Sequence, residues 1–262
     1  MWTIHGIEFE SRLLLASEGY SDLNTMAAVH EASGTQMVSL ALRQPEISAI
    51  TLPNIIDHID RSRIRLLPTT AGSYTAEDAV ATAQLAAERL QTTWIKLDVT
   101  GNPRTLFPCM EGTLEAARQL VKEGFTVLPS CSDDPVICER LADIGCAAIM
   151  PLASVAGNGR GLANPARLEM IRHIVNIPMI VAAGIGTAYE AAQAMELGVD
   201  AVLVHAVITG AEQPTRMAHA MRLAVEAGRI VRREGYDARG AVKRLHWVDR
   251  RRPRVEEHSA EP

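Results

Sequence analysis

Eight short apolar segments recur along this chain, and their alternation with longer stretches limits the folds that it can adopt. The segments are 13–16, 37–42, 64–67, 94–99, 126–128, 147–152, 179–182 and 201–205. Their length and their valine, isoleucine and leucine content are typical of buried strands. The stretches between most of them are rich in alanine and leucine and have the periodicity of amphipathic helices. Eight strands that alternate with helices predict a closed (β/α)8 barrel, the TIM-barrel fold.

Turn and capping residues support these boundaries. A glycine ends a helical stretch and precedes a strand at four positions: Gly34, Gly124, Gly145 and Gly198. Residues 75–78 (Thr-Ala-Glu-Asp) resemble a capping box, and 132–135 (Ser-Asp-Asp-Pro) predict another helix start. The aspartates of the second segment are therefore expected to cap a helix.

An open, doubly wound sheet is the alternative architecture. We prefer the barrel because the strand count is eight and no Gly-x-Gly-x-x-Gly follows the first strand. Residues 1–240 are expected to form a single barrel domain, in which residues 1–10 make a small hairpin that closes one end. Residues 241–262 are charged and lack apolar periodicity, so we expect a flexible tail there.

The composition bounds the class of protein. Of 262 residues 47% are apolar, and a net charge of −5 gives no electrostatic reason to expect nucleic-acid binding. No apolar run approaches the about 18 residues of a membrane span, and no signal peptide is visible, so we expect a cytoplasmic protein without a membrane partner. The four cysteines form no Cys-x-x-Cys pair and lack zinc spacing, which favours reduced thiols and no metal site.

Lys96 is unusual because it lies inside one of the apolar segments, 94–99. Burying an ammonium group is costly unless it is paired or neutralised. A neutral lysine amine can attack a carbonyl and form a Schiff base. Asp98, two residues later, would point to the same side of a strand and could shuttle protons. The local sequence is equally compatible with this catalytic pair and with a purely structural ion pair.

Three segments that follow predicted strands could bind an anion: 156–161, 181–187 and 204–206. Active sites of such barrels form at the carboxyl ends of the strands, and phosphates often bind after strands seven and eight. Glycines let backbone N–H groups approach an anion, and a helix N-terminus favours negative charge. These segments predict a phosphate-bearing ligand, although plain tight turns would give the same pattern.

Three more side chains are expected at the same mouth of the barrel. His205 ends strand eight and could bind phosphate, transfer protons or be a hydrogen-bonded core histidine. Glu18 follows strand one and Arg43 follows strand two. Either could contact a substrate, and either could be a solvated loop charge.

A series of short motifs runs through the chain in order: Arg12-Leu13, Glu31-Ala32-Ser33-Gly34, Ala41-Leu42-Arg43, Thr70-Ala71-Gly72, Tyr74-Thr75-Ala76-Glu77-Asp78-Ala79-Val80, Trp94-Ile95-Lys96-Leu97, Val121-Lys122-Glu123-Gly124-Phe125, Asp133-Asp134-Pro135-Val136, Gly145-Cys146-Ala147-Ala148, Ala183-Gly184-Ile185-Gly186, Ala194-Met195-Glu196-Leu197-Gly198 and Leu223-Ala224-Val225-Glu226-Ala227-Gly228-Arg229. From about residue 1 to residue 236 the chain therefore resembles the thiazole synthase family of thiamin biosynthesis. So many matches in order are highly specific.

The resemblance implies a (β/α)8 barrel enzyme in which Lys96 forms an imine with 1-deoxyxylulose 5-phosphate. A ubiquitin-like sulfur carrier protein delivers sulfur from its C-terminal thiocarboxylate, and a glycine-derived imine completes the thiazole. The resemblance also implies a homo-oligomer and no bound cofactor. Positions that match the family's phosphate and sugar contacts, with Gly159 as a further candidate, are Gly157, Ala183, Gly184, His205 and Ala206.

Several departures from the family lie at the catalytic mouth. Ala182 stands where the family has an aspartate, and a methyl group cannot transfer a proton. Asp98 replaces the family's glutamate, and His205-Ala206 replace its Asn-Thr. Because the helices match while the mouth differs, the sequence predicts a change of substrate.

The predicted activity is therefore that of a 2-thiosugar synthase, a diverged member of the family. Lys96 would capture the aldehyde of an opened phosphosugar such as glucose 6-phosphate, the carbonyl would move to C2, and sulfur would be added there. The main alternative is thiazole synthase itself, with Asp98 or His205 in place of the missing carboxylate. A non-catalytic barrel that binds a sugar phosphate, and a phosphosugar aldolase, are further alternatives.

Overall fold

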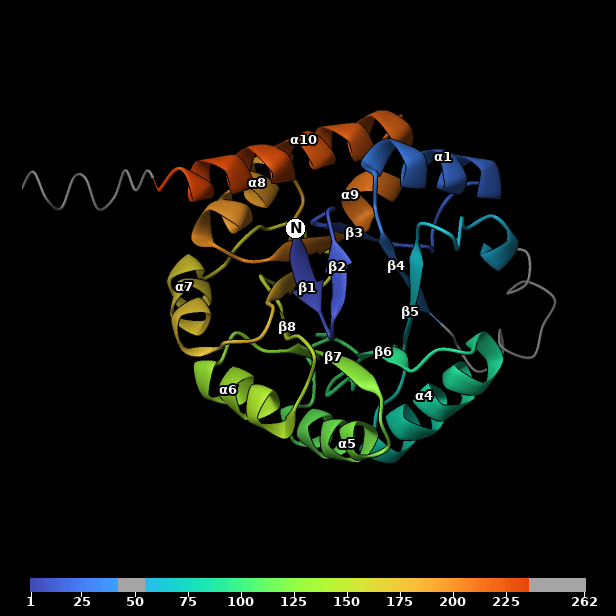
Figure 1. Cartoon of the computed structure of the whole chain (residues 1–262), viewed down its shortest axis with the longest axis vertical. Coiled ribbons are helices and arrows are strands. Elements are labelled where there is room, and N and C mark those ends of the chain that lie inside the picture. Colours follow the sequence, from blue (N-terminus) through green and yellow to red (C-terminus); the bar gives the residue numbers. More distant parts are fainter. Residues whose placement is uncertain (42–54, 236–262) are drawn as a thin grey trace, which may run out of the picture.

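A computed structural model describes residues 1–41 and 55–235 of the chain. Eight parallel strands surround the centre of the molecule (Figure 1). Each is a short run of mostly buried residues and overlaps one of the apolar segments from which a strand was predicted. The strands are β3 (Leu13–Ala16), β4 (Met37–Ala41), β5 (Arg65–Thr69), β6 (Trp94–Leu97), β7 (Thr126–Cys131), β8 (Met150–Pro151), β9 (Ile180–Ala182) and β10 (Ala201–Val204).

The sheet closes on itself. Its order follows the chain, except that the first strand, β3, also pairs with the last, β10. A parallel bridge between Ile149 and Met179 joins β8 to β9, and the N–H of Ile180 donates to the carbonyl of Ile149 at 2.9 Å. This closure confirms the predicted (β/α)8 barrel and rules out the open sheet, which would leave two unpaired edges.

In the part of the chain that the structure describes, seven longer helices lie in the outer ring, and a short helix follows β10 (Figure 1). The predicted capping residues act as expected: Thr75 and Asp134 accept hydrogen bonds at helix starts, and Gly34, Gly145 and Gly198 end helices in the left-handed conformation. The helices are α1 (Leu23–Ser33), α4 (Ala76–Leu90), α5 (Met110–Lys122), α6 (Pro135–Ile144), α7 (Pro165–Ile174), α8 (Ala188–Leu197), α9 (Ala206–Thr209) and α10 (Pro214–Arg233).

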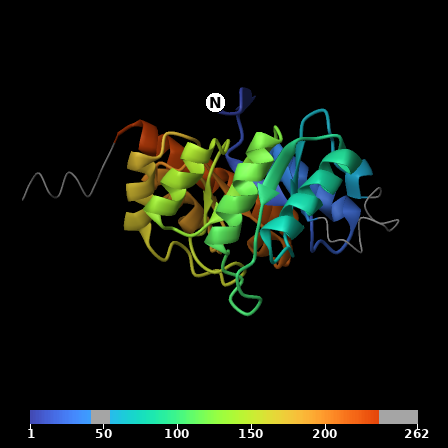
Figure 2. The same cartoon turned by 90° about the horizontal axis from the view of Figure 1, so that it is seen from below.

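The predicted hairpin consists of β1 (Trp2–Ile4) and β2 (Ile7–Phe9). Its two turn residues, His5 and Gly6, have φ angles of 47° and 76°, the positive values that a tight two-residue turn requires. The hairpin lies across the amino-terminal end of the barrel, opposite the longer loops that leave the strands (Figure 2). It packs Trp2, Ile4 and Phe9 onto the barrel interior and seals that end.

The core has two layers. Alternate strand residues such as Leu13 and Leu15 face the helices, and their neighbours such as Leu14 face the barrel interior together with the hairpin. Complete burial of one such leucine side chain stabilises the folded state by about 1.5–3 kcal/mol. The interior layer fills the amino-terminal half of the barrel interior, and the interior is open at the carboxyl ends of the strands.

Two sequence expectations cannot be compared with this fold. The domain boundary at residue 240 and the tail at 241–262 lie outside the described residues. Within the described part of the chain, no helix combines the length and apolar character needed to cross a membrane.

Candidate active site

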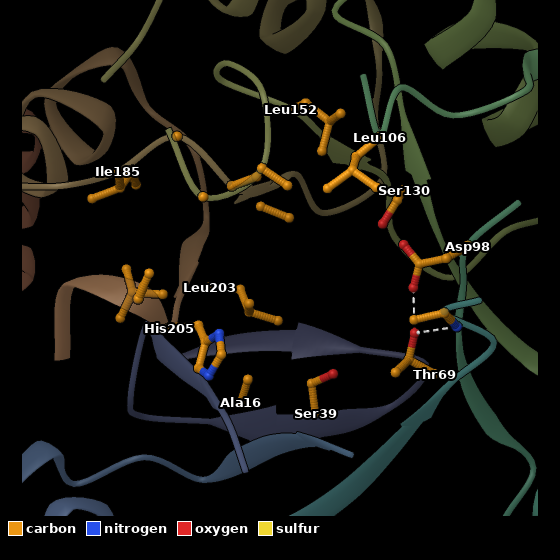
Figure 3. A pocket seen from close by; sticks show the side chains of 18 of the residues that line it. Ala16, Ser39, Thr69, Asp98, Leu106, Ser130, Leu152, Ile185, Leu203 and His205 are labelled. Carbon is orange, nitrogen blue, oxygen red and sulfur yellow. Dashed lines mark hydrogen bonds between the residues drawn. The ribbon is translucent and has the colours of Figure 1, made fainter. Parts of the chain in front are cut away.

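A pocket of about 600 Å³ opens at the carboxyl ends of the strands. Its floor is the top of the apolar interior layer, and Leu106 and Leu152 line its outer part (Figure 3). Arg43 lies outside the described residues. The other nine candidate residues all line this pocket: Glu18, Lys96, Asp98, Gly157, Gly159, Ala183, Gly184, His205 and Ala206.

Lys96 and Asp98 form a close ion pair on one wall. Lys96 Nζ lies 2.8 Å from Oδ1 and 2.6 Å from Oδ2 of Asp98. The two side chains are 14% and 18% exposed, so the pair is shielded from bulk water but reachable from the pocket. A lysine ammonium group must lose a proton before it can attack a carbonyl as an amine. Asp98 is in position to accept that proton.

Asp98 is itself held firmly. Burial would raise the pKa of its carboxyl group, but the charge of Lys96 and hydrogen bonds from Lys96, Ser130 and Thr69 outweigh burial and keep this pKa below its usual value. Thr70 fixes the backbone: its hydroxyl donates to the Asp98 carbonyl at 2.7 Å and accepts from the Asp98 N–H at 2.8 Å. Asp98 is therefore ionised and fixed beside the amine.

Thr69, Thr70 and Ser130 were not among the site residues expected from the sequence. Figure 3 shows Thr69 and Ser130 beside Asp98 on the same wall. Both belong to strands that are otherwise apolar at their carboxyl ends, β5 and β7. The signal that singled out Lys96, a polar residue within a buried strand, would have found them too.

His205 lies across the pocket from Asp98 (Figure 3). Its Nε2 is 2.7 Å from the backbone carbonyl of Glu18. A carbonyl only accepts, so Nε2–H donates and Nδ1 of a neutral imidazole remains an acceptor. The Glu18 carboxylate accepts from the N–H of Ala41 at 2.5 Å, at the end of β4. Glu18 therefore supports the pocket wall instead of presenting a free charge to a substrate.

Glycines bring together the loops that follow β8 and β9. The N–H of Gly161 donates to the carbonyl of Gly184 at 2.8 Å. A Cβ added at Gly186 would lie only 2.8 Å from the Cα of Gly159, so no larger residue allows this approach. Ala183 has a φ of 82°, a left-handed conformation that is strained for alanine and that clusters at ligand sites.

The N-terminus of α8 differs from the sequence expectation. The Glu190 side chain accepts from the N–H groups of Gly186 and Thr187 at 2.7 and 2.9 Å, which completes a capping box. These amides are thus engaged by the chain's own carboxylate. Among the described residues, the N–H groups of Gly184 and Ile185 have no hydrogen-bond partner and remain able to bind an anion.

Ala182 lies at the pocket floor and is 2% exposed. It pairs with Leu203 of β10, and both side chains line the pocket. Among the described lining residues, only Glu18 and Asp98 carry carboxylates. The carboxylate that the family places at residue 182 has no counterpart on this part of the wall.

Potential metal ligands do not gather in this part of the molecule. Within residues 1–41 and 55–235, no three His, Cys, Asp or Glu side chains form a group that could hold a metal ion. All four cysteines are free thiols, three of them buried. The described functional groups of the pocket are therefore an amine, two carboxylates, an imidazole, hydroxyl groups and backbone amides.

The fold and this pocket define a (β/α)8 barrel enzyme with a lysine–aspartate pair at its carboxyl mouth. The family model described as "Thiazole biosynthesis protein ThiG" matches residues 3–243. The chain belongs to the thiazole synthase family, whose members are sulfur-transferring enzymes.

Curated relatives agree with this assignment. The thiazole synthase of Myxococcus xanthus is 52% identical over 228 residues, which cover 87% of each chain. That of Geobacter metallireducens is 50% identical over 232 residues, covering 88% of this chain and 89% of that protein.

Solved structures also resemble this chain. A crystal structure of the Amycolatopsis orientalis BexX/CysO complex contains a chain that is 34% identical, with a TM-score of 0.83 over 90% of this chain and 96% of that one. A thiamine phosphate pyrophosphorylase from Pyrococcus furiosus, 14% identical, matches 83% of this chain and 96% of its own with a TM-score of 0.60 and shares the fold alone.

Proposed function

We propose that this protein is a 2-thiosugar phosphate synthase, which replaces the C2 oxygen of a phosphosugar such as glucose 6-phosphate with sulfur. The observation that carries the proposal is the pairing of an intact Lys96–Asp98 centre with Ala182 in the floor of the same pocket. Imine formation and sulfur addition need an amine and one proton shuttle. Closing an aromatic thiazole needs further proton transfers, and the family's carboxylate for them is absent.

The first steps use Lys96. Its amine attacks C1 of the open-chain aldehyde and water leaves, which gives an imine. Asp98 then accepts the C2 proton, and a proton is delivered to C1, so that the carbonyl moves to C2 and an amine remains on C1. The hydrogen bond from Thr69 holds the Asp98 carboxylate, and two hydrogen bonds with Thr70 hold the Asp98 backbone. The carboxylate would therefore stay beside both carbons.

Sulfur then enters at C2. The thiocarboxylate sulfur of a carrier protein attacks the C2 carbonyl, the acyl group passes to the former carbonyl oxygen, and the carrier leaves as a carboxylate. The resulting C2 thiocarbonyl tautomerises back to a C1 imine, and water releases the 2-thiosugar phosphate from Lys96. The sugar and the carrier exchange one oxygen for one sulfur, and no redox cofactor is consumed.

The phosphate would bind on the side of the pocket formed by β9 and β10. The free amides of Gly184 and Ile185 lie there, beside His205 and the start of α9. Gly157 and Ala206 also line this pocket. The pocket volume, about 600 Å³, suits a hexose phosphate with the end of a peptide.

We further propose that the sulfur donor is a ubiquitin-like carrier protein. The relative at 34% identity was solved in a complex with a second protein, CysO, which supports a protein partner for this barrel. The flexible end of a carrier must reach Lys96 through the mouth, where Gly157 and Gly159 have no bulky side chains to block it.

Thiazole synthase itself is the second candidate, because curated thiazole synthases are about half identical to this chain. Intact mass after borohydride reduction separates the two. Glucose 6-phosphate and 1-deoxyxylulose 5-phosphate are tested in separate tubes, with Lys96→Ala as the control. An adduct with the hexose phosphate alone, lost in the variant, supports the thiosugar proposal. An adduct with the deoxyxylulose phosphate alone overturns it in favour of thiazole synthase.

A further inference from the structure

A second cavity, of about 320 Å³, lies at the amino-terminal end of the barrel, far along the strands from the lysine pocket. It opens between the start of β3 and the C-terminal half of α10, the helix that packs against α1 and α8 (Figure 1). Four arginines line it: Arg12, Arg222, Arg229 and Arg233. The carboxylates in its wall are those of Glu10 and Glu226.

The wall of this cavity carries more positive than negative charge. Arg222 Nε is paired with Glu226 at 2.7 Å, which removes one charge of each sign. Arg12 donates to the Asp200 carbonyl at 2.5 Å, and its guanidinium lies 3.8 Å from an Asp200 carboxylate oxygen. Asp200 is shared, because Arg172 lies 3.7 Å from its other oxygen.

Arg229 makes no close ion pair among the described residues, and the charge of Asp200 offsets the effect of burial and of Arg233 only in part. The Nε of Arg229 is buried and has no hydrogen-bond partner among the described residues. A buried guanidinium donor without an acceptor is destabilising. Burial, and then Arg233, lower the pKa of Arg229, and burial together with Arg229 lowers that of Arg12 to about 10. The cations of this cluster therefore repel one another.

The usual structural role of such residues explains only part of the cluster. Arginines in the last turn of a helix interact favourably with its carbonyl groups, which accounts for Arg232 and Arg233 at the end of α10. It does not account for Arg12, which is 7% exposed and lies on the barrel itself. It also leaves the unpaired Nε of Arg229 unexplained.

We propose that this cavity is an anion site that binds a phosphate-type group carrying at least two negative charges. Such an anion would accept from Arg229 and Arg233 and reduce the repulsion with Arg12. It would also tie α10 to β3, and so join the last helix of the barrel to its first strand. The site is separate from the lysine pocket and needs none of the residues of the proposed reaction.

Trp2 provides a local signal for a binding test, because the Arg12 guanidinium lies 5.7 Å from the centre of its ring. The full-length protein is titrated with inorganic pyrophosphate in the presence of a chelator, and tryptophan fluorescence and thermal unfolding are followed. Acetate, with a single charge, is the ligand control. We expect saturable binding of pyrophosphate that weakens as salt is added.

The double variant Arg229→Gln/Arg233→Gln tests whether the anion binds in this cavity. It should weaken binding by about tenfold for each arginine removed. Arg216→Gln, an exposed arginine near the start of the same helix, should leave binding unchanged. If the double variant does not fold, Arg229→Met, which keeps the apolar packing of the side chain, replaces it in the binding test. No saturable response up to about 10 mM pyrophosphate, or equal affinity in the double variant and the Arg216 control, would overturn the proposal.

Discussion

The imidazole of His205 is held by the backbone carbonyl of Glu18, with Nε2 at 2.7 Å from the oxygen. This bond joins the end of β10 to the loop after β3, the last strand of the barrel to the first. It also orients the ring, because a donor at Nε2 leaves Nδ1 as the free acceptor. A substrate hydroxyl at the barrel mouth can therefore donate to Nδ1 of this ring.

Replacement of His205 should weaken substrate capture. In His205→Phe the ring shape is kept, but Nδ1 can no longer contact the substrate and the Glu18 carbonyl loses its donor. The affinity for the phosphosugar, measured from the concentration dependence of borohydride trapping, should fall by about tenfold. His219→Asn, on the exposed face of α10, is the matched control. Unchanged affinity in His205→Phe would show that the ring does not touch the substrate.

Ala182→Asp should move the activity toward thiazole formation. The new carboxylate would stand at the pocket floor, where the family has its aspartate, and could transfer protons during ring closure. Because the site is almost fully buried, the variant should lose about 1–3 kcal/mol of unfolding free energy. Turnover of 1-deoxyxylulose 5-phosphate with carrier and dehydroglycine is measured in wild type, Ala182→Asp and Ala182→Asn. Equal thiazole formation by all three would contradict the role given to this position.

Glu190→Ala should loosen the loop after β9. The substitution removes the acceptor for the N–H groups of Gly186 and Thr187, and losing a helix cap costs about 0.5–2 kcal/mol of unfolding free energy. It also frees two amides next to the proposed phosphate site. Urea unfolding should report the loss of stability, and Glu190→Gln, which keeps one side-chain oxygen, should lose less. If both variants unfold like wild type, the capping box contributes nothing to stability.

His30 should make the protein less stable in acid. It is 3% exposed on α1, neither ring nitrogen has a partner among the described residues, and burial lowers its pKa from 6.5 to about 4. Since the unfolded chain binds this proton more readily, stability falls as the pH drops below 6.5 and levels off below 4, by up to about 3 kcal/mol.

The free energy of unfolding, measured with urea at pH 7 and at pH 4.5, tests the direction of this pH dependence. His30→Met should unfold with a smaller difference between the two pH values, because it removes one titrating group. The exposed His219→Asn should keep the wild-type difference. A His30→Met variant that is as acid-sensitive as wild type would show that other groups dominate.

The fold could be predicted from the sequence because barrel formation depends on local patterns. The apolar segments, the capping residues Thr75 and Asp134 and the helix-ending glycines are each determined by neighbours along the chain, and each was found where expected. The lengths of the strands were predicted less accurately than their positions. In the predicted segment 147–152, for example, only Met150 and Pro151 form a strand. Barrel curvature, which depends on distant strands, decides where pairing stops.

The sequence by itself also determined which strand ends bear polar groups, and thereby brought Lys96, Asp98 and His205 to one mouth. Only the tertiary structure decided what each group does there. The Glu18 carboxylate supports β4 through Ala41, and the imidazole of His205 bonds the Glu18 carbonyl. Glu190, by contrast, forms a Thr-x-x-Glu capping box with Thr187, a local pattern that the sequence already contains. The partners of Glu18 and His205 are 23 and 187 residues away along the chain, so these contacts depend on how distant segments approach one another in space. Local pattern reaches only a few residues, whereas hydrogen-bond partners are set by the packing of the whole barrel.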